Sequence, residues 1–82
     1  MGVYYIFVNK RTGEANENPI PAGHGLTRIA KFESCCELEQ DRIFKSVISV
    51  NPGWLDTDII TAYPDYPEYG KITYNNGVIT SE

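Results

Sequence analysis

The pattern of hydrophobic positions is clearest at the beginning of the chain, where residues 3–8 read Val-Tyr-Tyr-Ile-Phe-Val. β-Branched and aromatic residues favour strands, and side chains alternate between the two faces of a strand. Both alternating sets are apolar here, which is typical of a strand covered on both sides. We therefore predict a strand over residues 3–8 in the interior of a sheet.

Residues 9–25 are polar and are broken by glycine and proline, so we expect a turn followed by a surface loop. Leu26–Phe32 favours a second strand, although a helix stays open as the alternative for this segment. The segment Trp54–Ala62 is open between a strand and a short helix, and Asp56 would be the N-cap of that helix.

A helix is predicted over Cys35–Ile48, because apolar residues recur there at helical spacing. Ser34 and Glu37 have the spacing of a capping box at its beginning. Asn51-Pro52-Gly53 would end it. The β-branched residues at 47–50 are the weak part of this prediction and could instead form a strand.

Asn76-Gly77 is a strong signal for a two-residue hairpin turn, and we predict a hairpin over residues 71–80. The simplest assembly is an α+β fold, in which a small antiparallel sheet packs against one main helix on one face. The N-terminal strand would pair with the C-terminal hairpin. We expect residues 1–82 to form a single domain.

The length of 82 residues leaves little room for both a core and a deep active site, so we predict a protein that is not an enzyme. No apolar run approaches the length needed to span a bilayer, and the first residues do not resemble a signal peptide. We therefore expect a cytoplasmic protein without membrane contact.

Two adjacent cysteines, Cys35 and Cys36, cannot connect distant parts of a fold by disulfides. They would lie in the first turn of the helix, where the helix dipole lowers the pKa of a thiol. A small thiol-dependent enzyme or redox protein is therefore an alternative. Together with His24 they do not form the ligand pattern of a zinc site, and we predict no metal and no cofactor.

The most informative segment is residues 63–69, where Tyr-Pro-acid occurs twice and a third tyrosine follows. Proline fixes its own backbone and pushes the preceding residue out of the helical region. The local preference is therefore polyproline II, which has three residues per turn. Tyr63, Tyr66 and Tyr69 would then share one stripe, and Asp65 and Glu68 another.

The charges sharpen this hypothesis. The chain has a net charge of −4, and no lysine or arginine occurs between Lys45 and Lys71. The acids of that interval alone give −4, so the rest of the chain is balanced. The stretch also carries the aromatic residues that dominate protein interfaces. The predicted partner-binding residues are Trp54, Asp56, Asp58, Tyr63, Asp65, Tyr66, Glu68 and Tyr69.

These observations predict a non-enzymatic protein-binding module, an adaptor or inhibitor that engages a partner with a basic surface. Such a partner could be a nucleic-acid-handling protein, and by analogy with virus-encoded inhibitors the chain could be viral. The net acidity disfavours direct nucleic-acid binding. In a competing interpretation the tyrosines pack on the protein's own sheet and the acids keep a loop hydrated. A structural subunit that self-associates is a further alternative.

Overall fold

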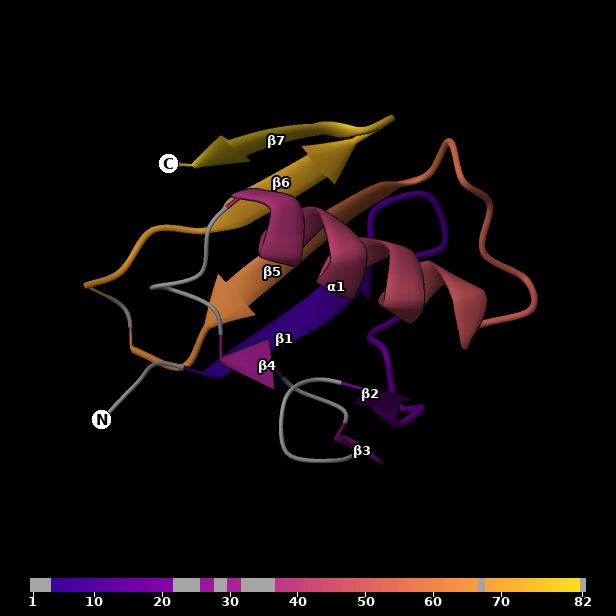
Figure 1. Cartoon of the computed structure of the whole chain (residues 1–82), viewed down its shortest axis with the longest axis horizontal. Coiled ribbons are helices and arrows are strands. Elements are labelled where there is room, and N and C mark those ends of the chain that lie inside the picture. The colour runs from indigo at the N-terminus through magenta and orange to yellow at the C-terminus, as the bar shows by residue number, and fades with distance from the viewer. Residues whose placement is uncertain (1–3, 22–25, 28–29, 32–36, 67, 82) are drawn as a thin grey trace.

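The computed structural model describes residues 4–21, 26–27, 30–31, 37–66 and 68–81, and its elements are drawn in Figure 1. The main sheet has five strands in the order β4-β1-β5-β6-β7, and every neighbouring pair in it is antiparallel. Strands β2 and β3 form a separate pair. The elements are β1 (Tyr4–Asn9), β2 (Ile20–Pro21), β3 (Leu26–Thr27), β4 (Ala30–Lys31), α1 (Glu37–Ser49), β5 (Ile59–Pro64), β6 (Ile72–Asn75) and β7 (Val78–Ser81).

The predicted α+β fold is confirmed, because one helix lies across one face of an antiparallel sheet that contains the N-terminal strand and the C-terminal hairpin (Figure 1). The predicted direct pairing of these two parts is wrong. Strand β5 lies between them, with Ala62 opposite Phe7 on one side and Ile60 opposite Tyr74 on the other.

Strand β5 also decides between the two structures left open for residues 54–62. Its first three residues are β-branched, Ile59-Ile60-Thr61, and both Ile60 and Ala62 are fully buried. Because β5 lies in the centre of the sheet, it pairs with a neighbouring strand on each side. A short isolated helix would gain no such cross-strand contacts. Asp56 therefore precedes a strand and is not a helix N-cap.

The helix begins at Glu37 and ends at Ser49, close to the predicted end at Ile48. Cys35, Cys36 and the capping residue Ser34 lie outside the described residues. Val47 and Ile48 stay helical despite their β-branched side chains, because both are buried against the sheet. Asn51 Nδ2 donates a hydrogen bond of 2.7 Å to the carbonyl of Val47 and so satisfies one unpaired group at the helix end.

The core lies between α1 and the sheet. Phe44 of the helix stacks on Tyr74 at a centroid distance of 4.9 Å and meets Phe7 edge-on at 5.5 Å. Such offset and edge-on ring contacts add to the energy of simple burial. The buried apolar residues are Tyr5, Phe7, Ile20, Ile43, Phe44, Val47, Ile48, Trp54, Ile60, Ala62, Ile72 and Tyr74.

The hairpin prediction is confirmed. Asn76 and Gly77 connect β6 to β7, and their φ angles of 50° and 89° are the positive values that a two-residue type I′ turn requires.

The strand predicted over 26–32 is wrong as a single element. The described residues of this region form two short strands: β3 pairs with β2, whereas β4 pairs with β1.

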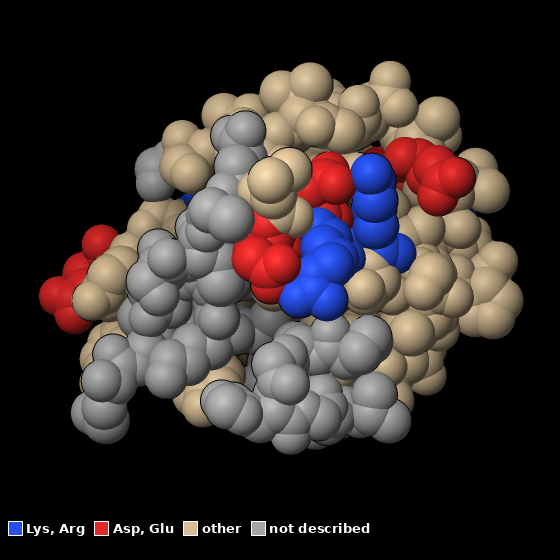
Figure 2. Space-filling model, in the orientation of Figure 1, with Lys and Arg blue, Asp and Glu red and all other residues tan. Residues whose placement is uncertain are grey.

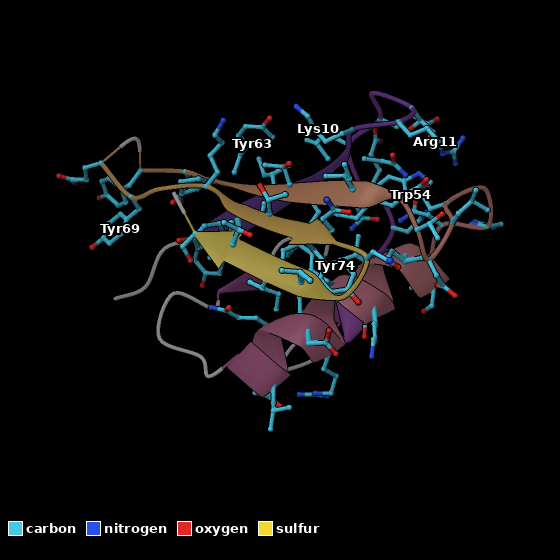
Figure 3. All side chains as sticks on the ribbon, turned by 90° about the horizontal axis from the view of Figure 1, so that it is seen from above. Lys10, Arg11, Trp54, Tyr63, Tyr69 and Tyr74 are labelled. Atoms are coloured by element: carbon cyan, nitrogen blue, oxygen red, sulfur yellow. The ribbon has the colours of Figure 1, made fainter. Side chains whose placement is uncertain are left out.

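The sheet has one face without a described helix. Figure 3 shows Lys10 and Tyr63 pointing away from α1, whereas Tyr74 points toward it. Within the described ranges, no helix combines the length and apolar character needed to cross a bilayer.

Candidate functional site

The predicted docking stretch does not form one continuous surface. Trp54, Asp56 and Asp58 precede β5, and Asp65 and Tyr66 follow it. Six residues of extended strand span roughly 20 Å. The two parts therefore lie at opposite ends of the sheet, as the positions of Trp54 and Tyr69 in Figure 3 show.

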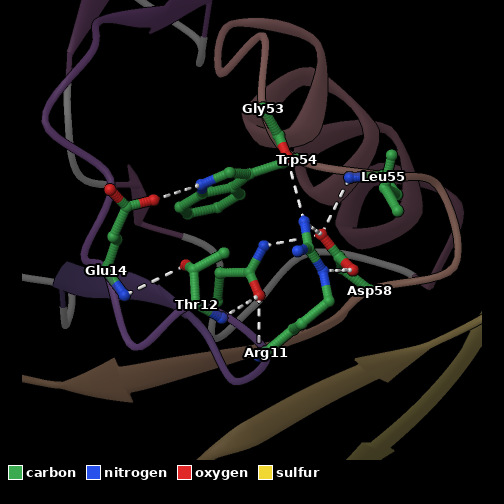
Figure 4. A network of polar contacts seen from close by, with 8 residues as sticks. Arg11, Thr12, Glu14, Gly53, Trp54, Leu55 and Asp58 are labelled. Atoms are coloured by element: carbon green, nitrogen blue, oxygen red, sulfur yellow. Dashed lines mark hydrogen bonds and ion pairs between the residues drawn. The ribbon is translucent and has the colours of Figure 1, made fainter.

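At the first end, Asp58 is the centre of a hydrogen-bond network with Asn9, Arg11 and Leu55, and we call these residues, together with the neighbouring Trp54, the Asp58 corner. The side chain of Asp58 is 2 % exposed. It accepts hydrogen bonds from Asn9 Nδ2 at 2.8 Å, from Arg11 Nε at 2.6 Å and from the amide of Leu55 at 2.8 Å. Figure 4 shows the Arg11 guanidinium and the amide of Leu55 directed at the Asp58 carboxylate.

Arg11 holds the corner together, because its guanidinium contacts both the acid and the loop before β5. Nη2 donates to Asp58 Oδ2 at 3.0 Å and to the carbonyl of Gly53 at 2.9 Å. The hydrogen bond from Arg11 lowers the pKa of Asp58 well below its usual range, although burial opposes this. Asp58 is therefore an ionised structural group and is not accessible to a partner, contrary to the prediction.

Trp54 also belongs to the interior. It is 7 % exposed and is part of the core cluster, and its Nε1 donates to Glu14 Oε1 at 3.3 Å. Its remaining exposed edge helps to line an open hollow of about 310 Å³. The other lining residues are Glu14, Ala15, Glu17, Asn18 and Asn51. Of the predicted residues at this end, only Asp56 is exposed.

At the other end, the chain turns sharply between β5 and β6. The amide of Tyr69 donates to the carbonyl of Tyr66 at 3.1 Å, and the two rings meet edge-on with centroids 6.4 Å apart. A polyproline II helix contains no internal hydrogen bonds. The predicted extended segment with three tyrosines in one stripe is therefore wrong.

We call residues Asp65, Tyr66, Glu68 and Tyr69 the acidic tip. Tyr66 is 52 % exposed and Tyr69 is 47 % exposed. Both acids are exposed, and no ion pair among the described residues involves them. Acidic side chains project at this end of the molecule in Figure 2. The prediction put the tyrosines and the acids on separate stripes of an extended segment, whereas the structure places Asp65, Tyr66, Glu68 and Tyr69 on a turn.

The third tyrosine of the repeat, Tyr63, belongs to the sheet. It is partly buried in β5, opposite Ile6 of β1. Lys10 Nζ donates to its hydroxyl at 3.0 Å, and the ammonium groups of Lys10 and Lys71 lie 5.6 and 5.9 Å from its ring centroid. These distances are in the range of cation–π contacts. Sequence reasoning missed both lysines, because only the strand register brings them to Tyr63.

The thiol alternative concerns Cys35, Cys36 and His24, which lie outside the described residues. Within the described ranges, no group of three or more His, Cys, Asp or Glu side chains is arranged to hold a metal ion.

No protein-family model, curated protein or solved structure matches the chain. A function can therefore be argued only from the surface chemistry of the chain itself.

Proposed function

We propose that the chain is a non-enzymatic protein-binding module that engages a basic protein surface through the acidic tip. The observation that supports this best is the pair of exposed tyrosines, which meet edge-on in the same turn that carries two exposed carboxylates. Tyrosine supplies a large contact area with only two rotatable side-chain bonds, so its ordering on binding costs little.

The tyrosine rings and carboxylates of the acidic tip favour a partner that presents arginine side chains. An arginine side chain can stack on a tyrosine ring and also pair with a carboxylate through its planar fork. Since Asp65 and Glu68 have no ionic partner among the described residues, a basic partner would not have to break an existing ion pair. In its most specific form, the proposal is a cytoplasmic inhibitor that occupies the basic groove of a nucleic-acid-handling protein.

The experiment compares three forms of the protein by affinity capture, followed by calorimetry with the captured partner. The tip variant carries Asp65→Ala, Tyr66→Ala and Glu68→Ala. The control carries Glu17→Ala and Asp56→Ala. These substitutions also remove two negative charges, but from exposed positions at the opposite end. Matching circular dichroism and urea unfolding show that both variants remain folded.

We expect the tip variant to bind at least roughly thirty-fold more weakly, because interface hot spots contribute about 2 kcal/mol or more. The control should change the affinity by less than about three-fold, since rim charges affect mostly the association rate. Equal binding by the tip variant and the wild type would disprove the proposal. A loss only in the control would move the binding site to the hollow beside Trp54.

A further inference from the structure

The hollow beside Trp54 lies between the loop that joins β1 to β2 and the loop that follows α1. Side-chain hydrogen bonds connect these two loops. Asn18 Nδ2 donates to the carbonyl of Val50 at 3.0 Å and to Asn51 Oδ1 at 2.8 Å. Asn51 Nδ2 donates to Oδ1 of the buried Asn16 at 2.9 Å. The walls are therefore held in place before a ligand arrives, which lowers the cost of binding.

The side-chain N–H groups on the described walls of the hollow already have acceptors within the protein. Asn18 and Asn51 each donate two hydrogen bonds through Nδ2, so neither amide has a hydrogen left. The indole N–H of Trp54 donates to Glu14 Oε1 at 3.3 Å, as Figure 4 shows. The side chains of the lining can therefore offer a ligand acceptors, but no further nitrogen donor.

Two of the groups that remain are negatively charged. Glu14 and Glu17 both line the hollow and are exposed, and no ion pair between described residues involves either of them. The guanidinium of Arg11 is directed at Asp58 instead. Asn18 adds its amide oxygen as a neutral acceptor. A hollow with this lining favours a cationic ligand that carries several N–H groups.

We propose that the hollow beside Trp54 is a binding site for a guanidinium group. A guanidinium presents five N–H donors in one plane, so it can reach acceptors on separate residues. An ammonium is a compact charge that holds its hydration water strongly. The indole of Trp54 supplies an apolar surface beside the carboxylates of Glu14 and Glu17. A weakly hydrated, flat cation loses less than an ammonium when it leaves water for such a surface.

The size of the hollow limits the affinity. A volume of about 310 Å³ is at the small end of ligand pockets, and the hollow is open to solvent. A small ligand that keeps part of its surface in water gains little from each of its atoms. We therefore expect a dissociation constant of about 1 mM for a compound that carries one guanidinium.

Trp54 is the only tryptophan of the chain, so its indole N–H signal in a proton–nitrogen correlation spectrum reports on the hollow directly. The wild-type chain is titrated with N-acetylarginine amide up to about 20 mM, which covers the expected dissociation constant. We expect a saturable shift of the indole signal. A signal that does not move, or that moves without saturating, would overturn the proposal.

Two ligands of related shape test the selectivity. N-acetylcitrulline amide replaces the guanidinium by a neutral group of the same outline and should bind at least about ten-fold more weakly, because charge-assisted hydrogen bonds are the stronger ones. N-acetyllysine amide keeps the charge without the planar fork and should bind at least about three-fold more weakly. Binding of either compound as tightly as the arginine compound would overturn the assignment to a guanidinium.

A substitution in the lining tests the position of the site. Glu17→Gln should raise the dissociation constant of N-acetylarginine amide at least about three-fold, because it removes one of the two charges. The matched control is Asp56→Asn, which removes an exposed charge from outside the lining. It should leave the constant within about 1.5-fold, since salt screens charges that do not contact the ligand. Equal weakening in both variants would reveal a general attraction to acidic surface and overturn the proposal.

An arginine residue of a polypeptide and a free guanidinium compound present the same group. Methylguanidinium and the blocked peptide acetyl-Gly-Arg-Gly-amide distinguish these two sources. Binding of the peptide with the affinity of N-acetylarginine amide would support a polypeptide ligand. Binding of methylguanidinium without the peptide would support a small free ligand. Failure of both to shift the indole signal would overturn the proposal.

The guanidinium site goes beyond the proposed partner interaction, because the hollow and the acidic tip share no residue and lie at opposite ends of the sheet (Figure 3). Glu17→Gln leaves every residue of the tip unchanged, and the tip variant leaves every residue of the lining unchanged. A failure of one proposal is therefore distinguishable from a failure of the other.

Discussion

At the beginning of β5, Asp58 lies beside Trp54 in the interior, whereas just beyond its end Asp65 and Tyr66 lie in solvent. Both places combine an acid with an aromatic side chain, yet the first is a structural joint and the second is free surface. The difference comes from Arg11, which reaches the first acid from the loop after β1 and has no counterpart at the tip among the described residues. An acid and an aromatic residue close together in sequence therefore do not by themselves indicate a binding site.

The largest expected contrast is in the aromatic residues. Trp54→Ala should lower the free energy of unfolding by about 3–5 kcal/mol, because it empties a buried site of the core. Tyr66→Ala should change it by less than about 0.5 kcal/mol, as is usual for exposed positions. Urea unfolding followed by circular dichroism measures both values. If both variants lost the same free energy of unfolding, Trp54 and Tyr66 would not differ in their contribution to stability, contrary to the assignment of one to the interior and the other to the surface.

The acids should differ in their dependence on pH. Because the pKa of Asp58 is lowered by folding, the unfolded chain binds more protons at this group in acid. Its contribution to stability is therefore full above about pH 4, near the unfolded value, and is lost progressively as the pH falls further toward the folded pKa. Asp58→Asn should be less stable at neutral pH and show a flatter decline below about pH 4.

Thermal melts between about pH 2 and pH 7 measure this dependence, with Asp65→Asn as the control. The control should follow the wild-type profile throughout. A wild-type decline that persists unchanged in the Asp58→Asn variant would show that other carboxylates cause it.

The smallest expected effect concerns the fork of Arg11. Arg11→Lys keeps the charge but cannot contact Asp58 and Gly53 with a planar set of donors. The urea midpoint should fall, but by less than in Asp58→Asn, because the ammonium still neutralises the acid. Lys10→Arg is the control at the neighbouring exposed position and should leave the midpoint unchanged. A midpoint of Arg11→Lys equal to that of the wild type would mean that charge alone holds the corner.

Much of the fold could be predicted from local signals. The Asn76-Gly77 hairpin, the N-terminal strand and the position of the main helix follow from turn chemistry and from the period of the apolar residues. The insertion of β5 between β1 and the hairpin could not be predicted, because strand order depends on contacts between residues far apart in the sequence. Nothing in the local pattern at 54–62 distinguishes a central strand from a short helix.

The candidate site was predictable only in part. Composition identified the acids and tyrosines of residues 65–69, and they are exposed where they are described. The same reasoning placed Trp54, Asp58 and Tyr63 on one surface with them, which is wrong for the first two because both are buried. Proline suggested an extended segment, but the hydrogen bond from Tyr69 to Tyr66 makes a turn instead.

The sequence by itself determined the class of the fold and the concentration of negative charge between Lys45 and Lys71, because periodicity, turn chemistry and composition are local properties. Only the tertiary structure decided which of those charges are free. Arg11 is 47 positions away from Asp58 in the chain, and folding brings them to 2.6 Å. Burial and ion pairing depend on such distant partners, so the same acid can stabilise the interior or remain available at the surface.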